Sequence, residues 1–329
     1  MKVGSKVGNV CCSNVQPIKN KIVVERLVET LKSMELTPVL SPYIYEENNS
    51  FVGLGKERAE VLMSFYKDKE IQAIFDISGG DLANEVLTFL DFSVIQNNQK
   101  LFFGYSDLTT IINAIYAKTE VPSVLYQLRN LVFEHGEKQV QEFVATFLEN
   151  NEDKCAEYNP TIEQTEKIKK QQDSFWGEKD KKCTTIMQNF THKPLLNFQY
   201  EFIQGDVLQG VVVGGNIRCL LKLAGTPFWP DMQDKVLLLE ARGGMVLQMV
   251  TFLNQLKQMG VFEQVKGILL GTFTKMEEGN AVPSMVELVK EYVPGEMPIV
   301  KTGEIGHGTD SKAILIGEEI CLHRERIIL

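Results

Sequence analysis

The residues best suited to chemistry follow the apolar run Lys100-Leu-Phe-Phe103 and read Gly-Tyr-Ser106-Asp107. The run predicts a buried strand, and the helical spacing after it predicts a helix that begins at once. A strand, a tight turn bearing serine and a helix form the context of a nucleophile elbow, although Leu108 replaces the second glycine of G-x-S-x-G. The helix start offers backbone N–H groups to an oxyanion, and the N–H of Asp107 is a candidate donor. The alternative is that Ser106 or Asp107 only caps the helix.

A second turn, Ser78-Gly79-Gly80-Asp81, ends the preceding apolar run, Gln72-Ala-Ile-Phe-Asp-Ile77. Ligands of parallel α/β sheets bind outside the carboxyl ends of the strands, where both turns would lie. Glycines allow the backbone to approach a substrate closely, so an N–H of Gly80 or Asp81 is a candidate for the second oxyanion donor. An ordinary tight connection between strand and helix is the alternative.

A serine nucleophile needs a base, and the chain has four histidines. His307 lies in Thr302-Gly-Glu-Ile-Gly-His-Gly-Thr-Asp310, where glycines on both sides suit a loop that holds an imidazole against another segment. His135 falls in a charged turn, His192 in a polar stretch and His323 in a basic tail. His307 is therefore the favoured base, and a surface-loop histidine is the alternative.

The favoured acid is Glu240, which ends the apolar run Val236-Leu-Leu-Leu239. A carboxylate at the end of a buried strand needs a partner, because an unpaired buried charge is costly. That partner is either Arg242, two residues on, or the imidazole of His307. The second case gives a Ser106, Glu240, His307 triad, in one of the known chain orders, at a cleft between two halves of the molecule.

Metal and nucleotide motifs are missing from the sequence. There is no H-E-x-x-H, no pair of histidines at i and i+4, and no carboxylate–histidine cluster. The chain contains neither a Walker A motif nor G-x-G-x-x-G. We expect neither a metal ion nor a nucleotide cofactor.

Strand and helix signals alternate through residues 1–150, which predicts a doubly wound parallel α/β sheet. Residues 151–195 are rich in charge and predict a solvated connecting segment, in which Phe175 and Trp176 either close over a site or anchor the segment. Residues 196–329 predict a second α/β domain with closing strands at 313–316 and 319–322. Helical spacing in the first part predicts helices over 18–34, 56–66, 84–92 and 108–118.

The composition of the 329 residues is that of a soluble protein, with 44% hydrophobic and 23% charged residues. A net charge of −9 lacks the broad basic footprint of nucleic-acid binding. We find neither a signal peptide nor a membrane span in the sequence, and we expect a cytoplasmic protein with no membrane or nucleic-acid partner. The six cysteines have no zinc spacing, and we expect reduced, buried thiols.

Seven segments, in order along about 300 residues, resemble the serine-type LD-carboxypeptidases, a family that includes the microcin C immunity hydrolases. They are Ala73–Gly80, Leu90–Phe92, Lys100–Thr109, Val213–Asn216, Leu237–Glu240, Gly260–Gly271 and Ile305–Gly308. The resemblance implies a flavodoxin-like N-terminal domain, a smaller β-rich C-terminal domain, a homodimer and no metal. It also implies that Ser106, Glu240 and His307 form a catalytic triad.

By resemblance, the substrate is a murein tetrapeptide from which a terminal D-amino acid is removed. A carboxypeptidase should bind a terminal carboxylate, and the candidates Arg242, Arg218 and Lys301 stay equivalent at this point. One alternative is an amidase for aminoacyl- or peptidyl-nucleotides, with Trp176 stacking on the base. Another is a non-catalytic flavodoxin-like binding protein. The segment Cys11-Cys12-Ser13 stands where many members have Ala-Pro-Ser, which leaves the substrate more open than the chemistry.

Overall fold

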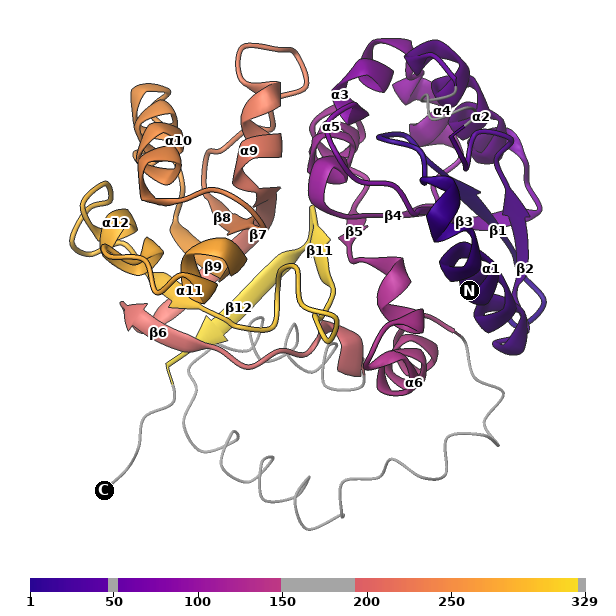
Figure 1. Ribbon diagram of the computed structural model, residues 1–329. Helices are drawn as coiled ribbons and strands as arrows, with labels where there is room; N and C mark the ends of the chain where they lie inside the picture. The colour runs from indigo at the N-terminus through magenta and orange to yellow at the C-terminus, as the bar shows by residue number, and fades with distance from the viewer. Residues whose placement is uncertain (47–52, 149–192, 325–329) are drawn as a thin grey trace, which may run out of the picture.

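Two six-stranded sheets with helices packed against them form the two halves of the molecule (Figure 1). The structure is a computed structural model and describes residues 1–46, 53–148 and 193–324. The predicted fold class, a flavodoxin-like α/β domain followed by a second α/β domain, is confirmed.

The first sheet has the strand order β2-β1-β3-β4-β5-β11. Its strands are β1 (Lys6–Val10), β2 (Thr37–Leu40), β3 (Ile71–Asp76), β4 (Leu101–Gly104), β5 (Ser123–Leu125) and β11 (Ile314–Ile316). The first five strands are parallel, and β11 pairs antiparallel with β5. The order 2-1-3-4-5 is that of a flavodoxin-like sheet, whose ligand crevice opens where the order reverses, beside β1 and β3.

Helices cover both faces of this sheet (Figure 1). They are α1 (Lys21–Ser33), α2 (Gly55–Lys67), α3 (Ala83–Val86), α4 (Phe92–Asn97), α5 (Thr109–Thr119) and α6 (Gly136–Phe147), with 3-10 turns η1 (Ile18–Asn20), η2 (Leu87–Phe89), η3 (Ser106–Leu108) and η4 (Leu128–Val132). Neighbours along a strand point to opposite faces. Phe75 and Phe103 therefore join the core under α1 and α6, whereas Ile74 and Phe102 join the core under α2 and α5.

The helix predicted over 84–92 is broken, because α3 and η2 end before a new helix, α4, begins. Asp91 starts α4 as its N-cap: its carboxylate accepts the N–H groups of Ser93 (3.0 Å) and Val94 (3.2 Å). Capping by aspartate fixes a helix start, which the apolar spacing alone does not reveal.

The second sheet has the strand order β12-β7-β8-β9-β10-β6. Its strands are β6 (Glu201–Gln204), β7 (Val207–Asn216), β8 (Lys235–Ala241), β9 (Gly267–Phe273), β10 (Ile299–Lys301) and β12 (Glu319–His323). The four central strands are parallel, and both edge strands are antiparallel. The carboxyl ends of β7 and β8 therefore lie side by side.

One face of this sheet packs on its own helices, and the other shares a core with the first half. The helical elements are η5 (Pro194–Leu196), α9 (Ile217–Leu220), η6 (Leu221–Leu223), α10 (Val246–Gln258), α11 (Thr274–Glu278) and α12 (Met285–Lys290). Leu237 and Leu239 face α10, whereas Val236 and Leu238 belong to the cluster that contains Ile112 of α5. This shared core fixes how the two halves sit against each other.

A strand from the end of the chain completes the first sheet rather than the second. We expected residues 313–316 to close the second domain, but β11 pairs with β5, as Figure 1 shows. The edge of β5 offers unpaired backbone groups, which no local sequence pattern reports. Between β10 and β12 the chain therefore crosses to the first half and back again, and the domain boundaries predicted at 150 and 196 stay a prediction. Of the predicted connecting segment 151–195, only residues 193–195 lie in the described part.

The cysteine prediction is right in part. Cys11, Cys12 and Cys219 are free and buried, and burial raises the pKa of each thiol. Cys321 is disulfide-bonded, which corrects the expectation of reduced thiols at that position. Disulfide pairing depends on which segments the fold brings together, and sequence spacing does not reveal it.

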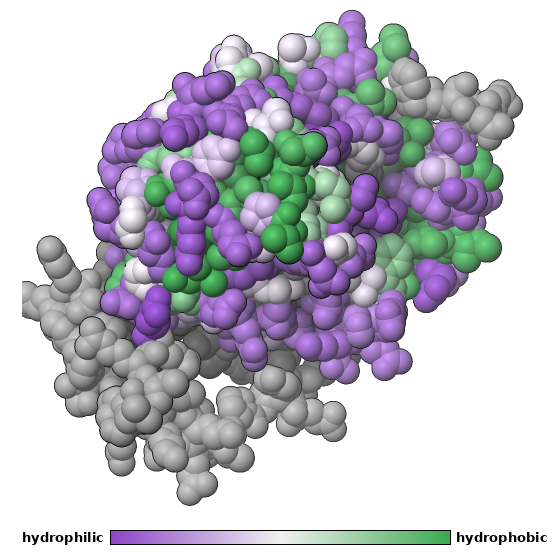
Figure 2. Space-filling model, turned by 60° about the vertical axis from the view of Figure 1, so that its left-hand side comes forward, coloured by the Kyte–Doolittle hydropathy of each residue, from purple (hydrophilic) through white to green (hydrophobic). Residues whose placement is uncertain are grey.

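The outer face that carries α10 and α12 shows hydrophobic side chains gathered among hydrophilic ones (Figure 2). Met245, Leu247 and Val282 are the exposed large hydrophobic residues of this region, with Leu247 at 83% and Val282 at 86% exposure. Within the described residues, no helix has the length and apolar character needed to cross a bilayer. The same residues contain no group of three or more His, Cys, Asp or Glu side chains that could hold a metal ion.

Candidate active site

Ser106 lies on a strained turn between β4 and α5. Tyr105 is still extended, whereas Ser106 has a φ of 54°, and the N–H of Leu108 closes the turn on the carbonyl of Tyr105 at 3.0 Å. A β-carbon at Gly104 would lie 2.7 Å from that of Leu108, so this turn needs a glycine there. A left-handed serine between strand and helix is the backbone of a nucleophile elbow, which raises the hydroxyl above the sheet edge.

His307 and Glu240 meet Ser106 from the second half of the molecule. The Nε2 atom of His307 lies 3.2 Å from Ser106 Oγ, and its Nδ1 atom lies 2.7 Å from Glu240 Oε2. A carboxylate accepts hydrogen bonds, which places the imidazole proton on Nδ1 and leaves Nε2 as the acceptor for the serine hydroxyl. The Glu240 side chain is fully buried, and that of His307 is 7% exposed. The three side chains expected to converge are therefore in contact.

Glycines allow the loop that carries His307 to pack tightly against β9. Gly306 has a φ of 149°, and a β-carbon there would lie 1.8 Å from Thr272 Oγ1. That hydroxyl instead accepts the backbone N–H of His307 at 3.3 Å. The buried Asn130 of η4 donates to Gly308 O (3.2 Å) and to Ser311 Oγ (2.9 Å). The loop is therefore held from both halves of the molecule.

The ring of Tyr105 packs on the imidazole of His307, with centroids 4.5 Å apart. Burial raises the pKa of Tyr105, and the charge of Glu240 raises it further. Tyr105 thus stays neutral, and its ring shields one side of the imidazole from solvent.

The three candidates for the oxyanion hole differ in their hydrogen bonds. The N–H of Asp81 donates to Asn14 Oδ1 at 2.9 Å, so it is already engaged. Gly80 has a φ of 129°, and a β-carbon there would lie 2.3 Å from the Asn14 side chain. The side chain of Asp107 is fully buried and held by Lys222, Ser13 and Ala83, so it lies away from the hydroxyl of Ser106. The N–H groups of Gly80 and Asp107 are thus the better candidates.

The basic candidates differ as sharply. Arg218 pairs with Asp81 and donates to the carbonyl of Gly80 at 3.0 Å. Its hydrogen bond lowers the pKa of Asp81. Lys301 donates to the carbonyls of Gly271 (2.9 Å) and Thr302 (3.0 Å) and pairs with Glu277 at 3.0 Å. Arg242 is exposed and has no carboxylate partner among the described residues, and Glu240 contacts His307 rather than Arg242.

The other predicted residues do not reach the triad or lie outside the description. His135 is exposed at the start of α6, and His323 lies on β12 with its Nε2 atom 3.3 Å from Cys321 Sγ. Trp176 and His192 lie outside the described residues.

Sequence reasoning missed four residues near the triad: Lys222, Arg129, Asn130 and Asn216. Asn216 ends β7 directly beside Glu240, and its buried Oδ1 atom has no partner among the described residues. The sequence marks Asn216 by the two glycines that precede it, Gly214 and Gly215. The structure explains Gly215, because a β-carbon there would lie 2.8 Å from Thr109 Oγ1 at the start of α5.

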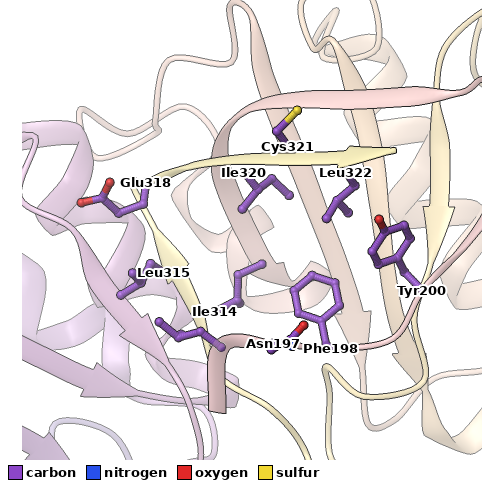
Figure 3. A pocket seen from close by; sticks show the side chains of 10 residues that line it. Asn197, Phe198, Tyr200, Ile314, Leu315, Glu318, Ile320, Cys321 and Leu322 are labelled. Atoms are coloured by element: carbon purple, nitrogen blue, oxygen red, sulfur yellow. The ribbon is translucent and has the colours of Figure 1, made fainter. Parts of the chain in front are cut away.

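A separate apolar pocket lies over β11 and β12 (Figure 3). It has a volume of about 70 Å³, and its lining includes Phe198, Tyr200, Ile320 and Leu322. None of the three contacting side chains described above lines it, so the pocket is distinct from their meeting point.

Comparison with known proteins places the chain in a family. Residues 7–126 match the LD-carboxypeptidase N-terminal domain, and residues 209–322 match the LD-carboxypeptidase C-terminal domain. The chain is 26% identical over 301 residues to the "Probable murein peptide carboxypeptidase" of Bacillus subtilis (strain 168), covering 89% of this chain and 82% of that protein. It is 23% identical over 284 residues to the microcin C7 self-immunity protein MccF of Escherichia coli, covering 82% and 76%.

Solved structures share the fold. Wild-type MccF without ligand superposes with a TM-score of 0.76 at 20% identity, covering 98% of this chain and 94% of that chain. The muramoyltetrapeptide carboxypeptidase from Oxalobacter formigenes superposes with a TM-score of 0.67 at 17% identity, covering 98% and 96%. Both domain matches, in order and over most of the chain, show that the protein belongs to the LD-carboxypeptidase family.

Proposed function

We propose that the protein is a serine hydrolase that removes a terminal D-amino acid from murein tetrapeptides. The observation that carries this proposal is the continuous chain of contacts from Ser106 Oγ through His307 to the buried Glu240. Relatives named as carboxypeptidases support a hydrolase, and the murein peptide carboxypeptidase of Bacillus subtilis supports this substrate class.

The hydroxyl of Ser106 attacks the carbonyl carbon of the scissile amide while Nε2 of His307 takes its proton. Glu240 stabilises the imidazolium through Nδ1. The backbone N–H groups of Asp107 and Gly80 receive the developing oxyanion. The imidazolium then protonates the departing amine, which leaves as the free D-amino acid. Water, deprotonated by His307, attacks the ester on Ser106 and releases the shortened peptide.

Two measurements test this proposal. Wild type and Ser106→Ala are incubated with murein tetrapeptide, and released D-alanine is followed by mass spectrometry. A fluorophosphonate probe labels the wild type but not Ser106→Ala. Ser64→Ala is the matched control, because Ser64 is an exposed serine on α2. Turnover by Ser106→Ala at the wild-type rate would refute the nucleophile, and absence of labelling with no amide turnover would favour a non-catalytic binding protein.

The second candidate substrate is an aminoacyl- or peptidyl-nucleotide amide, with the same chemistry at Ser106. The similarity to MccF favours it, since MccF structures include complexes with aspartyl sulfamoyl adenosine and glutamyl sulfamoyl guanosine. An aminoacyl-adenylate analogue in the same mass-spectrometric assay separates the two substrates. The role of Trp176, the homodimer and the cytoplasmic location stay predictions.

A further inference from the structure

Two guanidinium groups near the triad have no carboxylate partner in the part of the chain that the structure describes. Among the described residues, Arg58, Arg218 and Arg324 each pair with a carboxylate, whereas Arg129, Arg242 and the exposed Arg26 of α1 do not. Within the described ranges, the Nη atoms of Arg129 donate only to neutral amide oxygens, Gln16 Oε1 at 3.3 Å and Gln127 Oε1 at 3.1 Å. A guanidinium has five N–H donors, so Arg129 keeps donors for a ligand while its position is fixed.

Both arginines extend from segments that build the site. Arg129 lies on η4, just after β5, and the next residue, Asn130, holds the loop of His307. Arg242 follows Glu240 by two residues at the end of β8. Burial and the charge of Glu240 raise the pKa of Tyr105, while both arginines lower it. Both charges therefore act on the residue that precedes Ser106.

The two arginines also repel each other. Burial lowers the pKa of Arg129, and the charge of Arg242 lowers it further. Asp76 acts on Arg129 from a distance, but its oxygens already accept the N–H groups of Cys12 and Ser78 at 2.8 Å. Two like charges that act on each other without a paired anion are unfavourable, the more so because Arg129 is partly buried, and an anionic ligand relieves this cost.

We propose that Arg129 and Arg242 hold the free C-terminal carboxylate of the substrate peptide and so select for it. This assignment rests on the proposed function and deepens it, because it distinguishes a carboxypeptidase from an enzyme that cleaves inside a peptide. Planar guanidinium groups match a carboxylate through paired hydrogen bonds. Arg218 and Lys301 are already neutralised by Asp81 and Glu277, so they offer no free charge for this task.

The test compares two peptides that differ at one group: the murein tetrapeptide ending in D-alanine and the same peptide ending in D-alanine amide. Wild type should cleave the acid at least about 100-fold better in kcat/KM, given the strength of charge-assisted hydrogen bonds. Arg242→Met and Arg129→Gln should each lower kcat/KM for the acid about 10- to 100-fold, mainly through KM, and change that for the amide much less. Arg129→Lys keeps the charge and should recover part of the loss.

Arg26→Met is the matched control, because Arg26 is exposed on α1. It should keep the wild-type preference for the acid. Equal losses on the acid and on the amide in the arginine variants would overturn the carboxylate assignment. So would a wild type that the fluorophosphonate probe labels at Ser106 but that cleaves both peptides equally well, and the proposed nucleophile would then still stand. A wild type that neither reacts with the probe nor cleaves either peptide would overturn both proposals.

Discussion

Lys222 and the buried carboxylate of Asp107 form an ion pair that joins the two halves of the molecule beside Ser106. Lys222 also donates to the carbonyl of Asp81 at 2.8 Å. The second oxygen of Asp107 accepts Ser13 Oγ at 2.7 Å and the N–H of Ala83 at 2.8 Å. Asp107, whose backbone N–H is proposed to receive the oxyanion, is thus held through its own carboxylate by three other segments of the chain.

Removing the cation should therefore affect catalysis more than binding. In Lys222→Met, the Asp107 carboxylate keeps its burial and loses its countercharge, so the turn that bears Ser106 should shift. We expect kcat to fall about 10- to 100-fold with KM nearly unchanged, the effect of weakening an oxyanion donor. Steady-state kinetics on the tetrapeptide measure both constants.

Two further variants separate positioning from a general loss of stability. Lys222→Arg keeps the charge and should recover most of kcat. Lys266→Met removes a lysine from an exposed pair with Asp234 (3.8 Å) and should leave kcat unchanged. A Lys222→Met variant with wild-type kcat, or one whose loss appears only in KM, would contradict the positioning role.

The backbone strain at Ser106 predicts a trade between stability and activity. Ser106 has a φ of 54°, a conformation that glycine adopts freely and alanine does not. Ser106→Gly should therefore have a free energy of unfolding about 1 kcal/mol higher than Ser106→Ala, although both lose the nucleophile. Urea denaturation of the two variants measures this difference.

Ser64 provides a control of opposite sign. It lies within α2, where alanine stabilises a helix and glycine destabilises it. Ser64→Ala should be about 1 kcal/mol more stable than Ser64→Gly. The same order at both positions would show that φ at Ser106 does not store strain.

Local patterns predicted the elements that hold the triad, and the contacts among its side chains depend on long-range pairing. The apolar run before Gly104 and the apolar run before Glu240 each mark the end of a strand. Ser106 and Glu240 were therefore found from the residues that precede them. His307 was found because glycines surround it. In each case a short segment carries the signal, and the parallel sheets then bring the strand ends together.

Arg129 and Lys222 had no such signal. Neither is near a glycine turn or a strand end that the sequence marks, since β5 is only three residues long and was not predicted. Their importance comes from what they face across the two halves, which depends on strand order and on β11 joining the first sheet. The sequence could not predict which sheet β11 joins, because its apolar pattern suits either sheet.

Asp76 should make stability fall as pH rises. Asp76 is 3% exposed at the end of β3, and burial raises the pKa of its carboxyl above the usual range despite hydrogen bonds from Ser78 and Cys12. The folded protein thus keeps this proton to a higher pH than the unfolded chain does. The contribution of Asp76 is greatest below the unfolded pKa and is lost as pH rises through the folded pKa.

The measurement compares the free energies of unfolding of wild type and Asp76→Asn between pH 4 and pH 8. The wild type should lose stability relative to Asp76→Asn as pH rises through this range. Asp91→Asn is a control of opposite sign, measured from pH 5 down to pH 2. Hydrogen bonds from Ser93 and Val94 lower the pKa of Asp91, so its contribution is present above the unfolded pKa and is lost as pH falls. A difference for Asp76→Asn that grows in favour of wild type with rising pH would contradict the effect of burial.

Glu240 should be needed for catalysis without being needed for stability. Its side chain is fully buried, one oxygen accepts His307 Nδ1 at 2.7 Å, and Oε1 has no partner among the described residues. Glu240→Gln has the same shape but no charge to stabilise the imidazolium, so kcat should fall about 10²- to 10⁴-fold. Replacing a buried charge by an amide removes its desolvation cost, so the free energy of unfolding should stay equal or rise. Steady-state kinetics and urea denaturation of the same preparation measure kcat and the free energy of unfolding.

Glu240→Asp, which keeps the charge but withdraws it from Nδ1, should also lose activity. A Glu240→Gln variant that loses stability in step with kcat would instead assign the residue to the fold.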